Sequence, residues 1–192
     1  MKNKMKYGLM LMIGLWMTAS VMSSCSDEPD KSNFYTFKGQ MVSDYLLSNQ
    51  DFSEFSLILE RAGMMKQMSA YGAYTCFAPT NEAINRYLSK KGVSSVNELS
   101  EADCDTIART HLISNMYATS DMNTGVISTP NMNRRYIEVT HGLDKDSNAV
   151  VFLNRTSHII YELQDDSVEN GIMQPVSEGL ENFLEENPAI AK

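Results

Sequence analysis

The chain has 192 residues, with 24 acidic and 16 basic side chains and a net charge of −8. Its length fits a single domain that is large enough to bury its own hydrophobic core. The negative charge repels phosphate backbones and anionic headgroups, so we expect no nucleic-acid partner and no electrostatic attachment to a membrane.

The first 24 residues are typical of a cleaved export signal. Three lysines within the first six residues precede an uncharged, mostly apolar run over residues 7–21. At about 1.5 Å per helical residue this run is too short to cross a hydrocarbon core of roughly 30 Å comfortably. The run leads into two serines and Cys25, and it resembles a bacterial lipoprotein signal, with Met22 where leucine is usual. The resemblance implies cleavage before Cys25 and lipid attachment to its thiol; cleavage elsewhere, with a free Cys25, is the alternative.

Residues 25–35 are polar, lack apolar periodicity and predict a flexible acidic tether. Asp27 and Glu28 lie two and three positions after Cys25 and resemble the acidic signal that sends some lipoproteins to the outer face of the outer membrane. We therefore expect a lipid-anchored protein of the bacterial outer membrane, at the cell surface. The ordinary composition of a solvated linker explains the same residues without a signal.

Apolar residues at helical spacing predict two short helices between residues 37 and 63, the second ended by Gly63. A short buried strand over residues 74–77 follows. Pro79 stops this strand, and Thr80 caps the next helix.

That helix is expected to end near Gly92. Ser100 and Asp103 then form a capping-box pattern that opens a further helix, on whose apolar face His111 lies.

The second half of the chain changes to strand patterning. Residues 136–140 alternate, and residues 149–153 and 158–163 are rich in branched and aromatic side chains. Turn signals at Gly125, Gly142 and 170–171 separate them. Helices first and strands later indicate an α+β domain with a largely antiparallel sheet.

Three segments in this order resemble the fasciclin-like domain family. They are the helix at 52–63, the Tyr-Thr-Cys-Phe-Ala-Pro-Thr-Asn-Glu-Ala-Ile stretch at 74–84 and the Asn-Gly-Ile-Met-Gln-Pro-Val stretch at 170–176. The resemblance covers about residues 36–181. It implies an α+β wedge, with a mostly antiparallel sheet or sandwich from the second half and the helices of the first half packed on it. It also implies a role in extracellular adhesion or ligand binding without enzymatic activity.

The family motifs predict structural roles rather than chemistry for their residues. Gly171 is expected to adopt a positive φ before the last strand, and His111 to be a hydrogen-bonded core residue rather than a ligand or base. Two positions depart from the family pattern, because Thr110 replaces the tyrosine of a Tyr-His pair and Gln174 replaces a histidine. The motif residues assigned structural roles are Phe77, Pro79, Thr80, Asn81, His111, Asn170 and Gly171.

We identify no catalytic, cofactor-binding or metal-binding residues. The three histidines lack metal-ligand spacing, and no serine or cysteine lies in a recognisable nucleophile motif. Residues 144–155 begin like a calcium loop, but Ala149 and Arg155 replace its glycine and glutamate, so a hairpin turn is favoured. Cys76 and Cys104 are expected to be buried thiols, with a disulfide as the alternative.

Two short motifs concern glycosylation. Asn154 begins an N-glycosylation sequon, which a bacterial lipoprotein would not normally use. Asp166-Ser167-Val168 resembles a bacterial O-glycosylation motif in an expected loop, with Ser167 as the acceptor.

We therefore predict a membrane-tethered adhesion or interaction module that faces the surface or the periplasm. Its ligand is an unidentified protein or glycan. The alternative is an accessory ligand-binding lipoprotein of an outer-membrane nutrient (glycan) uptake system, in complex with a transporter. Residues 182–192 partly repeat the pattern of residues 45–53 and are either an ordinary tail or the start of a second domain copy.

Overall fold

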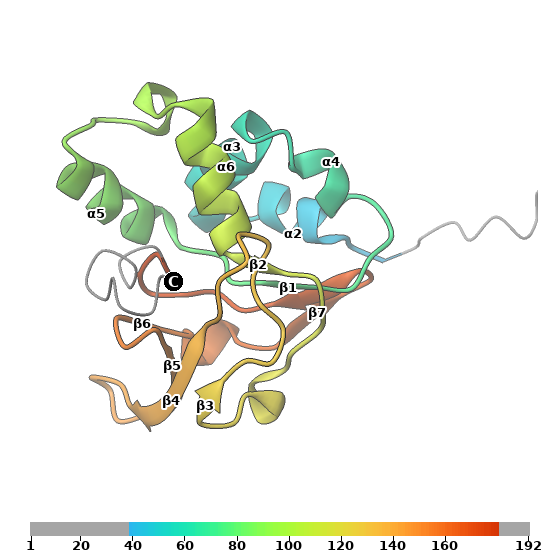
Figure 1. Ribbon diagram of the computed structural model, residues 1–192, viewed down its shortest axis with the longest axis vertical. Coiled ribbons are helices and arrows are strands. Elements are labelled where there is room, and N and C mark those ends of the chain that lie inside the picture. The colour runs from blue at the N-terminus through green and yellow to red at the C-terminus, as the bar shows by residue number, and fades with distance from the viewer. Residues whose placement is uncertain (1–38, 181–192) are drawn as a thin grey trace, which may run out of the picture. The chain divides into compact units, whose positions relative to one another are not determined.

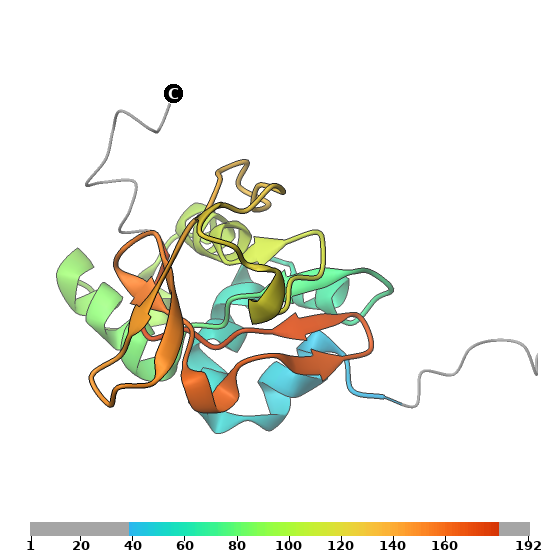
Figure 2. The same cartoon turned by 90° about the horizontal axis from the view of Figure 1, so that it is seen from below.

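The computed structural model describes residues 39–180 (Figures 1 and 2). The signal at 1–24, the lipid site at Cys25, the tether at 25–35 and the tail at 182–192 lie outside the described residues. No helix within residues 39–180 combines the length and apolar character needed to cross a bilayer.

Local capping signals set the helix boundaries in the first half of the described domain. Thr80 Oγ1 accepts a hydrogen bond from the Ala83 N–H at 3.3 Å, and Gly92, with φ 78°, ends the same helix. Ser100 and Asp103 form a reciprocal capping box at the next helix. The α-helices are α2 (Val42–Ser48), α3 (Ser53–Arg61), α4 (Met65–Met68), α5 (Asn81–Lys91) and α6 (Glu101–Thr110), with 3-10 turns η2 (Gln50–Phe52), η3 (Val96–Glu98), η4 (Thr119–Asp121) and η5 (Tyr161–Leu163).

The strands form two four-stranded sheets. The first has the order β2-β1-β8-β7, in which β1 and β8 are parallel and the other pairs are antiparallel. The second, β3-β4-β5-β6, is antiparallel throughout. The strands are β1 (Tyr74–Cys76), β2 (Leu112–Ile113), β3 (Gly125–Val126), β4 (Glu138–Leu143), β5 (Ala149–Leu153), β6 (Ser157–His158), β7 (Asp166–Val168) and β8 (Gly171–Met173).

The first sheet lies between two hydrophobic cores. In Figure 1 the helices gather on one side of it, and the second sheet lies on the other. One core packs α2 to α6 against side chains such as Cys76 and Met173, and the other packs Phe77 and Ile113 against the second sheet. All three residues of β1 are buried, since both faces of the strand are covered. The α+β class and the packing of the early helices on an antiparallel-rich sheet are confirmed.

Several local predictions for the second half are wrong. Gly125 and Gly142, read as turn signals, lie within β3 and β4, and the chain instead reverses at residues 144–148. The predicted strand at 158–163 pairs with β5 only as far as His158; Ile159 then bridges to Val176, the Ile160 N–H bonds the Pro175 carbonyl oxygen, and the chain enters η5. Strand-like composition did not distinguish a two-residue strand from the 3-10 turn that follows it.

Candidate functional site

Both the oxygen and the nitrogen of the Asn170 side-chain amide form hydrogen bonds inside the domain. Its Oδ1 accepts a hydrogen bond from the Val42 N–H at 2.9 Å, and its Nδ2 donates to the carbonyl oxygens of Met68 and Ala70, both at 2.8 Å. The side chain, 1% exposed, thus joins the start of α2 and the end of α4 to the turn before β8. We call these three bonds the Asn170 clamp. Its role is structural, because all three partners are backbone groups and the bonds to Val42 and Met68 are buried.

Gly171 is required by a close approach between two strands. It pairs with Tyr74, and a Cβ at this position would lie 2.6 Å from the Tyr74 carbonyl oxygen and 3.2 Å from Val42 Cγ2. The predicted positive φ is wrong: among the described glycines, only Gly63, Gly92 and Gly125 adopt one. Glycine is needed here for space rather than for a left-handed turn.

His111 is a hydrogen-bonded residue of the interior. Its Nδ1 lies 2.8 Å from the Ile107 carbonyl oxygen, and its Nε2 accepts the Leu180 N–H at 3.0 Å. A carbonyl oxygen can only accept, so Nδ1 carries the proton in this arrangement. The ring is fully buried and lies edge-on to Phe55, with centroids 5.5 Å apart. Both ring nitrogens are thus used to join α6 to the last described residues.

The Phe-Ala-Pro-Thr-Asn motif leads the chain from β1 into α5. Phe77 is fully buried in the second core, and Pro79 pairs with Val176 beyond the end of β8. Because proline has no N–H, the pairing ends there, and Thr80 turns the chain into the helix as its N-cap.

Asn81 ties the start of α5 to α3. Its Oδ1 accepts the Glu54 N–H at 2.9 Å, while its Nδ2 donates to the Gln50 carbonyl oxygen at 2.8 Å and to Ser53 Oγ at 3.0 Å. Like Asn170, this motif asparagine bonds segments that are distant in sequence.

The two positions that depart from the family pattern are buried as well. Gln174 exchanges hydrogen bonds with Asp165, at 3.0 and 2.6 Å, and donates to the Tyr117 carbonyl oxygen at 3.1 Å. The Asp165 carboxylate also accepts the N–H and the hydroxyl of Thr119. Thr110 is 3% exposed, and its hydroxyl donates to a carbonyl oxygen one turn earlier. Both substitutions therefore serve the interior of this chain.

Cys76 and Cys104 are free thiols, fully buried in the core beneath the helices. Burial raises the pKa of the Cys76 thiol strongly, because the thiolate would be desolvated. Neither thiol has the exposure that a reactive cysteine needs.

A polar cleft of about 590 Å³ opens on the surface of the described domain. Its walls are the start of α5, the turn between β4 and β5, the segment from Thr156 through η5, and the Ser177 and Glu178 pair. We call it the α5 cleft. It has the size of a small-molecule site, and it gathers side chains from four separate parts of the sequence.

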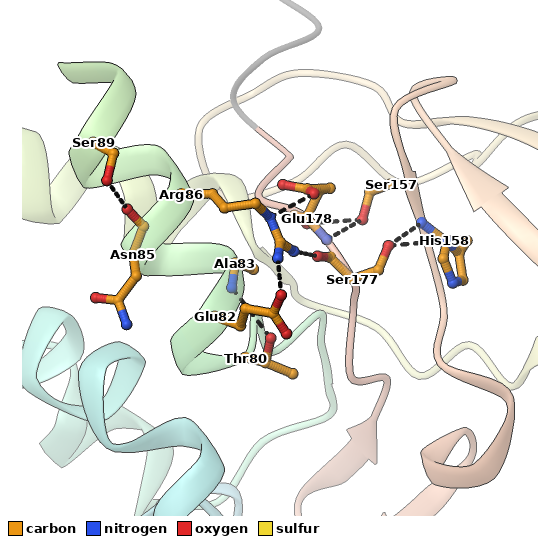
Figure 3. Close-up of polar contacts among 10 residues, drawn as sticks. All are labelled: Thr80, Glu82, Ala83, Asn85, Arg86, Ser89, Ser157, His158, Ser177 and Glu178. Carbon is orange, nitrogen blue, oxygen red and sulfur yellow. Dashed lines mark hydrogen bonds and ion pairs between the residues drawn. The ribbon is translucent and has the colours of Figure 1, made fainter.

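Arg86 holds the α5 wall of the cleft against the segment that follows β8 (Figure 3). Its Nη1 lies 2.6 Å from Glu82 Oε1, its Nε lies 2.7 Å from Glu178 Oε1, and its Nη2 donates to the Ser177 carbonyl oxygen at 2.5 Å. The guanidinium engages three partners at once, which suits its rigid, planar geometry. The positive charge of Arg86 is thus neutralised by carboxylates of the cleft wall.

The opposite wall is held by β6. Ser157 Oγ donates to the Glu178 carbonyl oxygen at 2.7 Å and accepts the Glu178 N–H at 3.2 Å. His158 Nδ1 lies 2.9 Å from Ser177 Oγ, and its ring packs against Phe152. The same Ser177 oxygen accepts the His158 backbone N–H at 3.2 Å, so this serine joins the segment after β8 to strand β6. The cleft therefore has walls fixed by hydrogen bonds.

The turn from Asp144 to Asn148 forms the rim of the cleft. Asp144 Oδ1 accepts the N–H groups of Asp146 and Asn148, both at 2.8 Å. Desolvation raises the pKa of Asp144, but the hydrogen bonds from Asn148 and Asp146, together with the nearby His158, outweigh it and leave that pKa below its ordinary value. The segment is the hairpin turn favoured from the sequence, and no group of three metal-ligating side chains occurs within residues 39–180.

The two glycosylation motifs differ in accessibility. Asn154 is 5% exposed, and its Oδ1 accepts the Glu138 N–H, so the sequon asparagine is part of the interior. Ser167 is exposed, but it lies in the edge strand β7 rather than in the predicted loop.

Sequence reasoning missed the α5 cleft. The spacing of Glu82 and Arg86 predicts a helical ion pair. No local pattern connects that pair with Ser177 and Glu178, because 91 residues separate Arg86 from Ser177.

Comparison with known proteins agrees with this architecture. The family model for the Fasciclin domain matches residues 50–181. Among solved structures, the chain is similar to a FAS1 domain pair from the insect cell adhesion molecule fasciclin I, with 16% identity and a TM-score of 0.53. The alignment covers 75% of this chain and 52% of that one, so the chain spans about half the length of the insect pair. At this identity the likeness concerns the fold alone. No functionally curated protein matches.

Proposed function

The chain belongs to the fasciclin domain family, and we propose that it is a non-catalytic adhesion or interaction module that a lipid on Cys25 holds at the bacterial outer membrane. The non-catalytic role is supported by the hydrogen bonds of the family-motif side chains, which are made within the domain. Asn81, His111 and Asn170 direct their polar atoms to backbone and side-chain partners inside the domain. They build a scaffold, which leaves the α5 cleft and the outer surface for contacts with a partner.

The anchoring part of the proposal rests on the sequence before the described domain. Full-length protein expressed in a Gram-negative host with labelled palmitate should incorporate the label and fractionate with the outer membrane. Cys25→Ala should lose both properties, whereas Cys104→Ala, which alters a buried thiol, should keep them. A Cys25→Ala protein that remains labelled and membrane-bound would refute the anchor.

Adhesion is tested on cells that display the anchored chain. Such cells should bind a surface coated with matrix proteins or glycans more strongly than cells that carry Cys25→Ala. Equal binding by the two strains, at equal expression, would refute adhesion through this protein.

Catalysis is tested at the hydrogen-bonded pair of Ser177 and His158. Ser177 should remain unlabelled by a fluorophosphonate probe, because its oxygen already accepts the His158 backbone N–H and, among residues 39–180, no carboxylate hydrogen-bonds the second ring nitrogen of His158 to orient it as a base. Labelling of the native chain that disappears in Ser177→Ala would contradict the non-catalytic assignment.

A second candidate function is an accessory binding lipoprotein of an outer-membrane nutrient uptake system. The size of the α5 cleft favours it, because about 590 Å³ suits a small solute. Cross-linking in the native membrane should then capture a transporter, and capture of one would count against adhesion.

Ser167 remains a candidate for O-glycosylation, because its side chain is exposed on β7. An intact mass equal to the processed polypeptide plus its lipid would exclude the modification.

A further inference from the structure

We propose that the α5 cleft binds an uncharged saccharide. This inference rests on the interaction role proposed above and names the site and the ligand class, which the family membership leaves open.

The charge of the lining disfavours an anionic ligand. Five acidic side chains and two basic ones line the cleft, a difference of 2 − 5 = −3 with neutral histidine. One of the two cations, Arg86, is bonded to Glu82 and Glu178, which leaves Lys145 on the rim. A phosphorylated or sulfated ligand would meet a net negative potential in such a cleft.

The distribution of polar groups favours a ligand with many hydroxyls over a compact cation or an apolar molecule. The carboxylates come from α5, the β4–β5 turn, η5 and position 178, and they form no metal-type group of three within the described residues. Ile160 is the one aliphatic residue in the lining. Hydrogen-bonding groups spread around a cleft match a ring whose hydroxyls point in several directions, because each hydroxyl both donates and accepts.

Tyr161 supplies the apolar platform that a sugar ring needs. It lies in the lining and is 46% exposed, whereas the other exposed tyrosines of the described domain, Tyr71 and Tyr136, lie outside the lining. A tyrosine ring offers a flat apolar face to the C–H groups of a sugar, while its hydroxyl stays available for a hydrogen bond. Its neighbour Glu162, also exposed in the lining, adds an acceptor beside the ring.

The cleft is also built to bind without rearrangement. The ion pair between Arg86 and Glu178 and the hydrogen bond from Ser157 to the Glu178 carbonyl oxygen fix its two sides. Preformed walls reduce the ordering cost of binding, which matters for a neutral ligand that gains little from charge.

The test is binding of full-length protein, in detergent, to a panel of neutral oligosaccharides, with heparin and a lysine-rich peptide as charged probes. At least one neutral oligosaccharide should bind, with little change between about 0.05 and 0.5 M NaCl, because screening acts on charges. Tyr161→Ala should weaken that binding about tenfold or more, the change expected when an aromatic contact of roughly 1.4 kcal/mol is lost. Tyr161→Phe, which keeps the ring, should retain most of it.

Tyr136→Ala is the matched control. Tyr136 is 57% exposed but lies outside the cleft lining, so its loss should leave saccharide binding unchanged. The same oligosaccharide, free and then attached to a carrier protein, separates a soluble solute from a glycan on a partner surface. Binding to both forms supports a saccharide site open to either source, and binding to one form identifies the source.

Two outcomes would overturn the proposal. One is that no neutral oligosaccharide binds, or that its binding is unaffected by Tyr161→Ala. The other is that only the lysine-rich peptide binds, with strong salt dependence, which would assign the cleft to a basic protein segment. If no neutral oligosaccharide binds but cells that display the anchored chain still adhere, the interaction role stands while the saccharide site falls.

Discussion

Replacing Asn170 by aspartate tests the Asn170 clamp with almost no change in side-chain shape. The variant keeps an oxygen for the Val42 N–H but loses the two N–H donations to Met68 and Ala70. It also places a carboxylate oxygen about 2.8 Å from two carbonyl oxygens, in a site that is 1% exposed. The perturbation is therefore electrostatic rather than steric.

The expected loss in the free energy of unfolding follows from the hydrogen bonds that Asn170→Asp removes. The buried Met68 carbonyl oxygen left unpaired costs about 1–3 kcal/mol, and the lost bond to the more exposed Ala70 adds about 0.5–1.5 kcal/mol, so the sum is roughly 1.5–4.5 kcal/mol before repulsion by the new charge is counted. A loss of about 3 kcal/mol is a large part of the 5–15 kcal/mol that is typical of a domain. With a urea dependence of about 2 kcal/mol per molar, the unfolding midpoint of Asn170→Asp should fall by about 1.5 M.

The assay is equilibrium unfolding of the full chain in urea, followed by circular dichroism. Asn123→Asp, which introduces the same charge at an exposed asparagine, should shift the free energy of unfolding by no more than about 0.5 kcal/mol. Asn170→Ala should also destabilise strongly, because it removes all three bonds of the clamp. Asn170→Asp as stable as Asn123→Asp would show that the clamp does not hold α2 and α4 in place.

Three further predictions concern close packing, charge and burial. Gly171→Ala should destabilise by about 1–3 kcal/mol in the urea assay, because its Cβ would meet the Tyr74 carbonyl oxygen at 2.6 Å. The hydrogen bond from Lys91, followed by those from Ser100, lowers the pKa of Asp103 below its ordinary 3.8. The stabilisation by Asp103 is therefore present above pH 3.8 and is lost as the pH falls through the lowered pKa, so Asp103→Asn should be less stable than wild type at pH 6 and should approach it near pH 2. In a Cys25→Ala chain, Cys76 and Cys104 should resist a thiol reagent when native and both react in guanidinium.

Each of these predictions has a contrasting measurement. Gly142→Ala should cost less than Gly171→Ala, because its Cβ meets the edge of the Phe152 ring at 3.0 Å and a side chain can move. An equal cost at the two glycines would contradict the backbone-contact argument. A stability difference for Asp103→Asn that is constant between pH 6 and pH 2 would exclude the linkage, and rapid native labelling of two thiols would exclude their burial.

Features that depend on neighbouring residues could be predicted from the sequence. The N-cap at Thr80, the capping box at Ser100 and the left-handed end at Gly92 all concern groups within a few positions of one another. The α+β class followed from the change of hydrophobic period between the two halves. The prediction of turns at Gly125 and Gly142 is wrong because it depends on distant residues. A glycine inside a strand and a glycine in a turn cannot be distinguished without the partner strand.

Distant partners were decided only by the tertiary structure. The sequence marked Asn170 and Gly171 as motif residues, but the clamp partners of Asn170 are 100, 102 and 128 residues away, and the space available to Gly171 is set by Tyr74. The same holds for the α5 cleft. Arg86 bonds Ser177 across 91 residues, and no local sequence pattern around either residue predicts this contact. Local sequence determines where helices begin and end, because capping and periodicity act over one or two turns. The packing of two sheets and a helical layer determines which polar groups meet, and so which side chains line the α5 cleft.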